Sequence, residues 1–440
     1  MLTSNEPARP FPSGLRPPIP GIILIAFFAV MAAVPSRSWS QSSATAGAPW
    51  RPSDASITHW TDYRPELNFR ESAVPVNQLP PVLDPSDVES TDVENWHHRR
   101  EHLLQSFRDH VYGDRPEGLE TAVRERDPAT VEIDGRTTTA RRFDVTASLE
   151  DQNHTFPLTL FLPPTDANVG GAFPVVLHLN NRYRADIDAP ETLTRQFFPL
   201  GDLLDAGFAA ATVHTSDIDP DRPDGRVDGV RKLGDADWGS LSAWAWGASR
   251  VLDHLRTIDV VDGDRIALVG HSRGGKAALW ASATDPRFAA VYANGSGCGG
   301  AAISRRRYGE TVAVITKNFP HWFTPRFADY ADRESDLPID QHQLIALSAP
   351  RPVYIGSATN DLWADPIGEY TSLVRAAPAY AVFGHDTITA TEPPPPGHLR
   401  VRGPTAYRLR HGDHDLTRDD WKAFLGFYRA VIGEGAERAR

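Results

Sequence analysis

From residue 173 onwards, short β-rich apolar runs alternate with longer helical runs, and this alternation limits the folds open to the chain. The apolar runs include FPVVLHL, FAAATVH and RIALVG, and the helical runs between them are FPLGDLLDAG and WGSLSAWAWGASRVLDHLRT. Strands joined through helices of this length pair in parallel by crossover connections, which place helices on both faces of the sheet. Two earlier runs, TTTARRFDVTAS and TFPLTLFLPP, predict an antiparallel entry to the same sheet. We therefore predict an α/β fold with a mostly parallel, doubly wound sheet.

The N-terminal end differs from the rest of the chain. Arg9 and Arg16 precede the uncharged stretch GIILIAFFAVMAAV, and a small-x-small site follows at residues 38–40. This order is typical of a secretory signal peptide, and the apolar stretch is shorter than the ~20 residues that span a bilayer. We predict a signal peptide over residues 1–40, no permanent membrane span after its cleavage, and a secreted or periplasmic protein.

The remaining chain divides at about residue 90. Residues 41–90 are rich in Pro, Ser, Ala and Asp without sustained periodicity, which predicts an extended N-terminal segment or linker. Thr91 and Glu94 have capping-box spacing and precede an amphipathic helix over about residues 92–112. We assign residues 91–440 to a single catalytic domain that includes this helix.

Composition excludes some partners. The formal net charge is −12, the basic residues are scattered, and Cys298 is the single cysteine of the 440 residues. An acidic chain without a basic patch argues against nucleic acid as a partner, and one cysteine forms no disulfide within the chain. We expect a monomer held together by its apolar core.

One motif carries chemistry. Gly270-His271-Ser272-Arg273-Gly274 lies between the strand run RIALVG and the helical run GKAALWASA. A G-x-S-x-G sequence between a strand and a helix is the nucleophile elbow of the α/β-hydrolase fold, in which the serine stands on a strained turn at the carboxyl edge of the sheet. We therefore predict an α/β-hydrolase fold with Ser272 as nucleophile.

A serine nucleophile needs a histidine base and a carboxylate that orients it, in the chain order Ser, Asp or Glu, His. The segment RHGDHDLT, between a strand and the last helix, offers His411 and His414. The segment VYIGSATNDLWADP offers Asp361 close to a strand end and Asp365 immediately before a proline. Because Asp before Pro often caps a helix, we assign Asp361 to the chemistry and Asp365 to the cap, with the reverse assignment left open.

The segment DIDPDRPDGRVD has part of the pattern of a metal-binding loop. Asp217, Asp219, Asp221 and Asp228 have the rough spacing of a calcium loop, but Arg222 stands where such a loop needs glycine. We predict a solvated loop at the rim of the site, and neither a metal nor a cofactor.

Five sequence blocks together resemble the bacterial glucuronoyl esterases of carbohydrate esterase family fifteen. They are GHSRGGKAALWA, NGSGCGGAAISRRRYGE, FPHWF, SAPRPVYIGSATNDLWADP and RHGDHDLT, within residues 95–430. The resemblance implies a metal-free hydrolase that cleaves the ester between 4-O-methyl-glucuronic acid of glucuronoxylan and lignin alcohols. It also implies roles for individual residues: Ser272 as nucleophile, His414 as base, Arg273 at the oxyanion, and Lys276, Glu310 and Trp363 as sugar-binding residues.

The chain departs from the family pattern in one turn. Many members carry a catalytic glutamate after the strand that follows the elbow, but this segment reads Ala293-Asn294-Gly295-Ser296-Gly297, with glycine at the position of the carboxylate. The other acid position of the family falls on Asp361. Two alternatives stay open: an acetyl or aryl polysaccharide esterase, and a carbohydrate-binding pseudo-hydrolase without turnover.

Overall fold

The computed structural model describes residues 48–84, 93–164 and 171–438. The predicted signal peptide and Thr91 lie outside these ranges. One sheet of eleven strands occupies the described part of the chain, in the order β1-β3-β4-β6-β5-β7-β8-β9-β11-β10 with β2 paired to β3. The strands are β1 Glu120–Glu125, β2 Ala129–Ile133, β3 Arg136–Leu149, β4 Gln152–Leu162, β5 Phe173–Asn180, β6 Ala209–His214, β7 Val261–His271, β8 Ala290–Asn294, β9 Val353–Ala358, β10 Leu399–Arg402 and β11 Thr405–Arg410.

The pairing confirms the predicted sheet. Strands β6, β5, β7, β8, β9 and β11 pair in parallel, whereas β1 to β4 join the sheet as antiparallel strands and β10 closes the other edge against β11. All six parallel strands therefore end at one edge, and the loops that follow them meet there.

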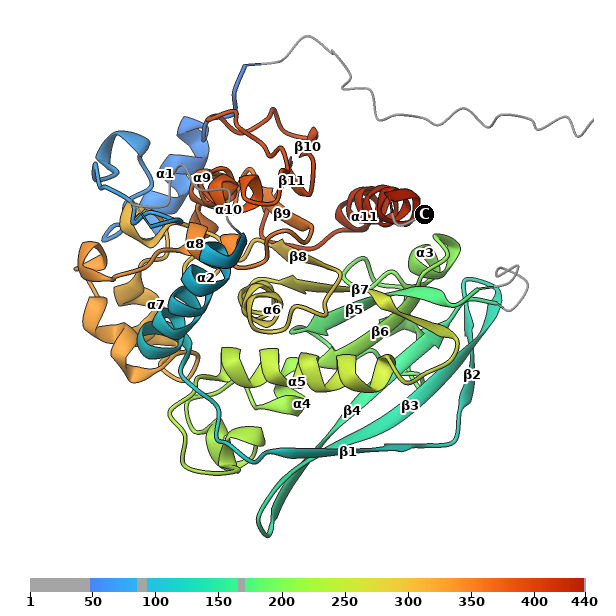
Figure 1. Cartoon of the computed structure of the whole chain (residues 1–440). Helices are drawn as coiled ribbons and strands as arrows, with labels where there is room; N and C mark the ends of the chain where they lie inside the picture. The colour runs from blue at the N-terminus through green and yellow to red at the C-terminus, as the bar shows by residue number, and fades with distance from the viewer. Residues whose placement is uncertain (1–47, 85–92, 165–170, 439–440) are drawn as a thin grey trace, which may run out of the picture. The chain divides into compact units, whose positions relative to one another are not determined.

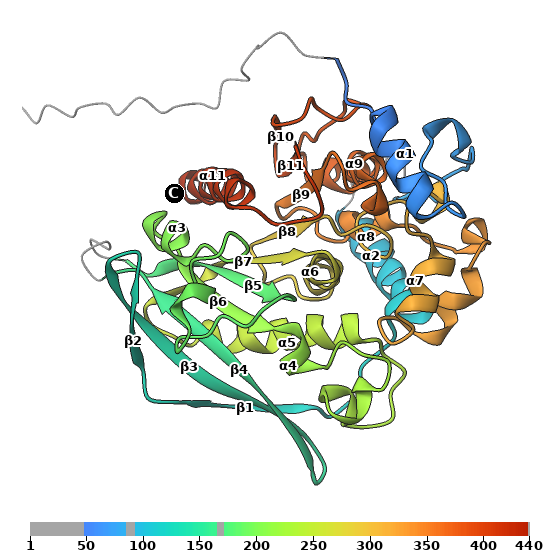
Figure 2. The same ribbon diagram turned by 180° about the vertical axis from the view of Figure 1, so that it is seen from behind.

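Helices cover both faces of the sheet. Figures 1 and 2 show α5 and α6 on one face and α3 and α11 on the other. Successive side chains of a strand point to opposite faces, so Val175 and Leu177 of β5 pack in the core under α5 and α6, whereas Val176 packs in the core under α3 and α11. The helices are α1 Asp54–Tyr63, α2 Val93–Phe107, α3 Leu200–Asp205, α4 Thr215–Ile218, α5 Ser240–Leu255, α6 Arg273–Thr284, α7 Val312–Asn318, α8 Gln341–Ala346, α9 Pro366–Arg375, α10 Ala377–Ala381 and α11 Arg418–Arg438.

The predicted helix over residues 92–112 is present as α2, which continues into the π-helical turn η2 (Arg108–Tyr112). It ends at Gly113, whose φ is +76° and whose missing Cβ would lie 2.0 Å from the carbonyl oxygen of Asp237. Only glycine fits this end, because both the positive φ and the close approach exclude a side chain.

The N-terminal segment differs from the expectation of an extended chain. Residues 54–63 form helix α1, which begins at Ser53, whose Oγ accepts a hydrogen bond from Ser56 N at 3.1 Å. None of the α1 residues is fully buried, and Ile57, Trp60 and Tyr63 are its only large apolar side chains, too few to reveal a helix in a sequence. Within the described ranges, no helix is long and apolar enough to cross a membrane.

Candidate active site

The turn between β7 and α6 has the strained geometry of a nucleophile elbow. Ser272 has φ 56° and ψ −126°, a conformation that costs a residue with a side chain about 1–3 kcal/mol. Strand and helix cross so closely that a Cβ on Gly270 would lie 2.1 Å from the carbonyl oxygen of Gly274. The glycines therefore permit the crossing, and the crossing holds Ser272 at the carboxyl edge of the sheet.

The half-buried His414 and the buried Asp361 form a pair at the same edge. The Nδ1–H of His414, in the loop between β11 and α11, donates to Asp361 Oδ2 at 2.6 Å. Asp361 follows β9, its side chain is 2% exposed, and its Oδ1 has no hydrogen-bond partner in the described structure. Burial opposes the charged imidazolium, but the Asp361 carboxylate outweighs it and raises the pKa of His414 above its ordinary value.

The turn after β8 connects the elbow to this pair. Ser272 N donates to Asn294 O at 2.8 Å. The next residue, Gly295, has φ +51°, and a Cβ there would lie 3.3 Å from His414 Nδ1 and 3.4 Å from Asp361 Oδ2. The turn that lacks the family's glutamate thus packs directly on the histidine and its aspartate. The carboxylate that contacts His414 is Asp361, which follows the neighbouring strand β9.

A second histidine, His271, lies against the ring of His414. The His271 and His414 rings lie 4.4 Å apart between centroids. Burial and the adjacent His414 hold the pKa of His271 well below its ordinary value, so its ring is neutral. Its Nδ1 then donates to Asn294 Oδ1 at 2.6 Å and its Nε2 accepts from Arg182 Nη2 at 3.1 Å.

Arg182 also fixes the loop that carries the base. Its Nη2 donates to the His414 carbonyl oxygen at 3.0 Å, and its Nη1 donates to Asp415 Oδ1 at 2.6 Å. The sequence does not identify Arg182, because it follows β5 and lies far in sequence from His271, His414 and Asp415.

Asp365 has the structural role predicted for it. Its Oδ1 accepts from Gly368 N at 2.9 Å at the start of α9, and its Oδ2 pairs with Arg306 Nε at 2.8 Å. Its contacts are therefore those of a helix cap and an ion pair, and it is Asp361 that contacts the histidine. His411, the other candidate base, is exposed.

A buried glutamate that the sequence did not reveal holds the β8 and β9 loops together. Glu369 of α9 accepts from Ser296 Oγ at 3.1 Å and Gly297 N at 2.9 Å, and its other oxygen accepts from Ser357 Oγ at 2.6 Å. Burial raises the pKa of Glu369 to about 7. These bonds fix the turn that packs on His414.

The side chain of Arg273 is clamped beside the elbow. It pairs with Asp221, and its guanidinium lies over the Trp322 ring at 4.7 Å from the centroid. Asp221 also accepts from His321 Nε2 at 3.0 Å and Trp322 Nε1 at 2.7 Å. Burial would raise the pKa of Asp221, but these donors and the arginine charge lower it to about 2. Asp221 is thus a permanent anion that holds Arg273 in place.

Replacing Asp221 by asparagine should lower kcat by about 10- to 100-fold with little change in KM, because Arg273 loses the charge that aims it. Removing an oxyanion donor altogether costs more, about 10²- to 10³-fold. Steady-state kinetics on a benzyl glucuronate ester measure the effect. The matched control is Asp228→Asn in the same loop, whose side chain is 56% exposed and should leave kcat unaltered. Wild-type kcat for Asp221→Asn would contradict this role.

The other predicted site residues form a cluster in which Lys276 and Glu310 are buried and Trp363 is half-buried. Lys276 Nζ donates to Ser296 O at 2.7 Å and Cys298 O at 2.6 Å, and it lies 3.5 Å from Glu310 Oε2. The backbone joins Glu310 to Trp363, because Glu310 N donates to Trp363 O at 3.0 Å. Burial raises the pKa of Glu310, with Lys276 and Trp363 opposing it. The structure thus brings these three residues together.

The aspartates of the possible metal loop form ion pairs with different arginines. Asp217 pairs with Arg184, Asp219 pairs with Arg231 at 2.8 Å, and Asp228 pairs with Arg222. Together with the Asp221–Arg273 pair, each carboxylate has its own arginine. Among the described residues no group of three or more His, Cys, Asp or Glu side chains could hold a metal ion.

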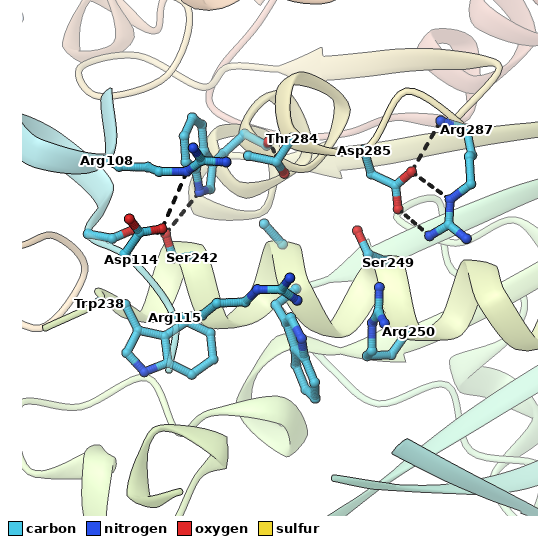
Figure 3. A pocket seen from close by; sticks show the side chains of 14 residues that line it. Arg108, Asp114, Arg115, Trp238, Ser242, Ser249, Arg250, Thr284, Asp285 and Arg287 are labelled. Carbon is cyan, nitrogen blue, oxygen red and sulfur yellow. Dashed lines mark hydrogen bonds and ion pairs between the residues drawn. The ribbon is translucent and has the colours of Figure 1, made fainter. Parts of the chain in front are cut away.

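A separate cavity of about 280 Å³ lies between α5 and α6 (Figure 3). Its lining includes Arg108, Arg115, Arg250, Arg287, Trp238, Trp246 and Trp280. It adjoins the C-terminal end of α6, about 18 Å along the helix from the elbow. None of the predicted site residues lines it, so we place the active site at the carboxyl edge of the sheet and not in this cavity.

The strained serine turn and the imidazole–carboxylate pair at the ends of parallel strands define an α/β-hydrolase of the serine class. Comparison with known proteins narrows the class. The family model described as fungal glucuronyl esterase matches residues 208–384. Carbohydrate esterase MZ0003, from an unknown prokaryotic organism, is 35% identical over 84% of this chain and 93% of its own length.

Solved structures agree with the sequence matches. A glucuronoyl esterase from Solibacter usitatus is 34% identical, with a TM-score of 0.72 over 82% of this chain and 100% of its own. A glucuronoyl esterase from Teredinibacter turnerae is 30% identical, with a TM-score of 0.73 over 88% of this chain and 96% of its own. The chain belongs to carbohydrate esterase family 15, and it is a carboxylic ester hydrolase.

Proposed function

We propose that this enzyme hydrolyses the ester between 4-O-methyl-D-glucuronic acid side groups of glucuronoxylan and lignin alcohols. Ser272 Oγ attacks the ester carbonyl carbon while His414 takes the hydroxyl proton, and Asp361 fixes the imidazole tautomer that can accept it. The oxyanion faces Arg273 and the free backbone N–H groups of the first turn of α6. His414 then gives its proton to the leaving alcohol, and an acyl-enzyme remains on Ser272.

Water completes the cycle. His414 removes a proton from the water as its oxygen attacks the acyl carbon, the Ser272–acyl bond breaks, and the proton passes to Ser272 Oγ. The products are the free alcohol and the uronic acid. Each step uses side chains of this chain alone.

The Lys276–Glu310–Trp363 cluster carries the proposal for a uronate substrate. The ammonium and carboxylate lie 3.5 Å apart, longer than a good hydrogen bond, while both are almost fully buried. A sugar hydroxyl can bridge the two groups by accepting from Lys276 and donating to Glu310. A buried charged pair of this kind favours a ligand with paired hydroxyl groups over an acetyl group, which has none.

The test is a comparison of methyl and benzyl glucuronate esters with acetylated xylan and an aryl acetate. We expect kcat/KM for the glucuronate esters to exceed the others by at least about 10²-fold, because an acetyl group on Ser272 has no hydroxyl to fill the buried hydrogen-bonding pair. Faster hydrolysis of the acetyl esters would replace the proposal with an acetyl polysaccharide esterase.

We further propose that residues 1–40 direct export and are then removed, so that the enzyme meets plant polysaccharide outside the cytoplasm. The support is the order of charged, apolar and small residues in the sequence. Determination of the N-terminal residue of the exported protein tests this. A mature chain that begins at Met1 would contradict it.

A further inference from the structure

Helix α1 lies directly beside the Lys276–Glu310–Trp363 cluster, here called the uronate cluster. It packs against η10 (Leu362–Ala364), and Figures 1 and 2 show it next to α9. Trp60 Nε1 donates to Asn360 O at 2.7 Å, and the rings of Trp60 and Trp363 stack with centroids 6.1 Å apart. The N-terminal segment therefore forms part of the wall of the site.

A row of aromatic rings runs outward from Trp363 along this helix. Tyr63 meets Trp60 edge to face at 6.0 Å, and 67% of its surface is exposed. The Arg64 guanidinium lies over the Trp363 ring at 4.9 Å from the centroid. Trp60 and Tyr63 lie three residues apart on α1, and Arg64 follows the last residue of the helix. Their contacts join Trp363, Trp60 and Tyr63 into one row.

This surface has the chemistry of a sugar platform. Flat rings fit the C–H faces of pyranose rings, and a guanidinium offers several donors to hydroxyl groups. Trp60 and Arg64 lie against Trp363. A glycan that is bound at the uronate cluster and extends past Trp363 therefore meets α1 next. The row starts at Trp363, whose carbonyl oxygen accepts from Glu310 N. In the proposed function Glu310 binds the uronic acid, so the row begins on the acyl side of the ester and not on the alcohol side.

We propose that the surface formed by Trp60 and Tyr63 of α1, together with Arg64 directly after the helix, is a glycan subsite that binds a xylan sugar next to the glucuronate. The proposal rests on the proposed function, because it extends the same substrate. It also gives the N-terminal segment a role in binding.

The experiment compares two esters with the same benzyl alcohol: benzyl glucuronate, and the benzyl ester of a glucuronoxylo-oligosaccharide. The measured quantity is the ratio of kcat/KM for the oligosaccharide ester to that for the small ester. We expect Tyr63→Ala to lower this ratio about two- to tenfold, and Tyr63→Phe to preserve it because the ring remains. Thr58→Ala, on another face of α1, is the matched control and should preserve the ratio.

The possible results distinguish a failure of the glycan subsite from a failure of the proposed function. A ratio unchanged in Tyr63→Ala, with wild-type hydrolysis of both esters, overturns the glycan subsite and leaves the proposed function standing. If Tyr63→Ala instead changes the ratio of kcat/KM between benzyl and methyl glucuronate, the effect depends on the alcohol. That result overturns the glycan subsite and favours a binding site for the lignin ring. If the wild-type enzyme cleaves neither glucuronate ester, the proposed function fails first.

Discussion

Replacing Ser272 by alanine should lower kcat/KM for benzyl glucuronate by at least about four orders of magnitude while the protein stays folded. The hydroxyl is the only group at the elbow that can form the acyl-enzyme, and removal of a serine nucleophile in comparable triads leaves only residual catalysis from the rest of the site. Alanine keeps the Cβ and therefore the backbone strain of the turn, so the thermal unfolding midpoint should shift little.

The matched control for this prediction is Ser249→Ala on α5, at the separate cavity between α5 and α6. It removes a serine hydroxyl outside the proposed site and should retain wild-type kcat/KM. An organophosphonate should label the wild-type enzyme at Ser272, because only an activated serine reacts with it at a useful rate. Turnover by Ser272→Ala above 1% of wild type would contradict the mechanism, and wild-type enzyme that resists labelling would favour the pseudo-hydrolase.

The parallel half of the fold and the elbow could be predicted because each depends on local sequence. Strand β7 and helix α6 have clear apolar patterns, and the glycines at positions 270 and 274 mark the crossing between them. The placement of Asp361 and His414 followed from one geometric rule, that loops after parallel strands meet at one edge. Their contact across 53 residues of sequence is a consequence of that rule.

The clamp on Arg273 could not be predicted, because nothing local marks it. Asp221 lies 52 residues before Arg273 and 100 residues before His321, in a loop whose aspartates looked alike in sequence. The aspartate that pairs with Arg273 is determined by the tertiary structure, which brings Asp221 next to that side chain. The block FPHWF resembled the family, but its sequence did not show that His321 and Trp322 both donate to one carboxylate.

Helix α1 escaped prediction for a different physical reason. It is ten residues long, has no fully buried side chain, and is flanked by proline-containing and polar chain. An isolated helix of this length is marginal in water, so tertiary contacts must contribute to its stability. Trp60 supplies the contacts to Asn360 and Trp363, and both partners lie about 300 residues away in the sequence.

Replacing Asp361 by asparagine should lower kcat by about 10⁴-fold, because the amide favours the wrong imidazole tautomer and no longer stabilises the imidazolium. The single hydrogen bond of 2.6 Å to His414 Nδ1 is the interaction that changes. Glu369, another buried carboxylate nearby, is fully engaged with Ser296, Gly297 and Ser357, so it should not substitute. Steady-state kinetics on benzyl glucuronate measure the loss.

The pH dependence distinguishes this role from a structural defect. The base must be neutral, and Asp361 raises the pKa of His414 although burial opposes the charge. The acidic limb of kcat/KM in the wild-type enzyme should therefore have its midpoint above about 6.5, the ordinary value for histidine. In Asp361→Asn the burial remains and the carboxylate is gone, so the pKa of His414 falls and the midpoint should move to lower pH.

Asp365→Asn is the matched control, with the same chemical change four residues further along the chain. Asp365 caps α9 and pairs with Arg306, so its loss should lower stability, by about 0.5–2 kcal/mol for the cap alone. Because Asp365 does not contact His414, the midpoint of the acidic limb should stay at its wild-type value. The opposite result would contradict the assignment: a loss of kcat by orders of magnitude and a shifted acidic limb in Asp365→Asn, with neither change in Asp361→Asn. The catalytic carboxylate would then be Asp365, and the 2.6 Å contact between Asp361 and His414 would not be needed for turnover.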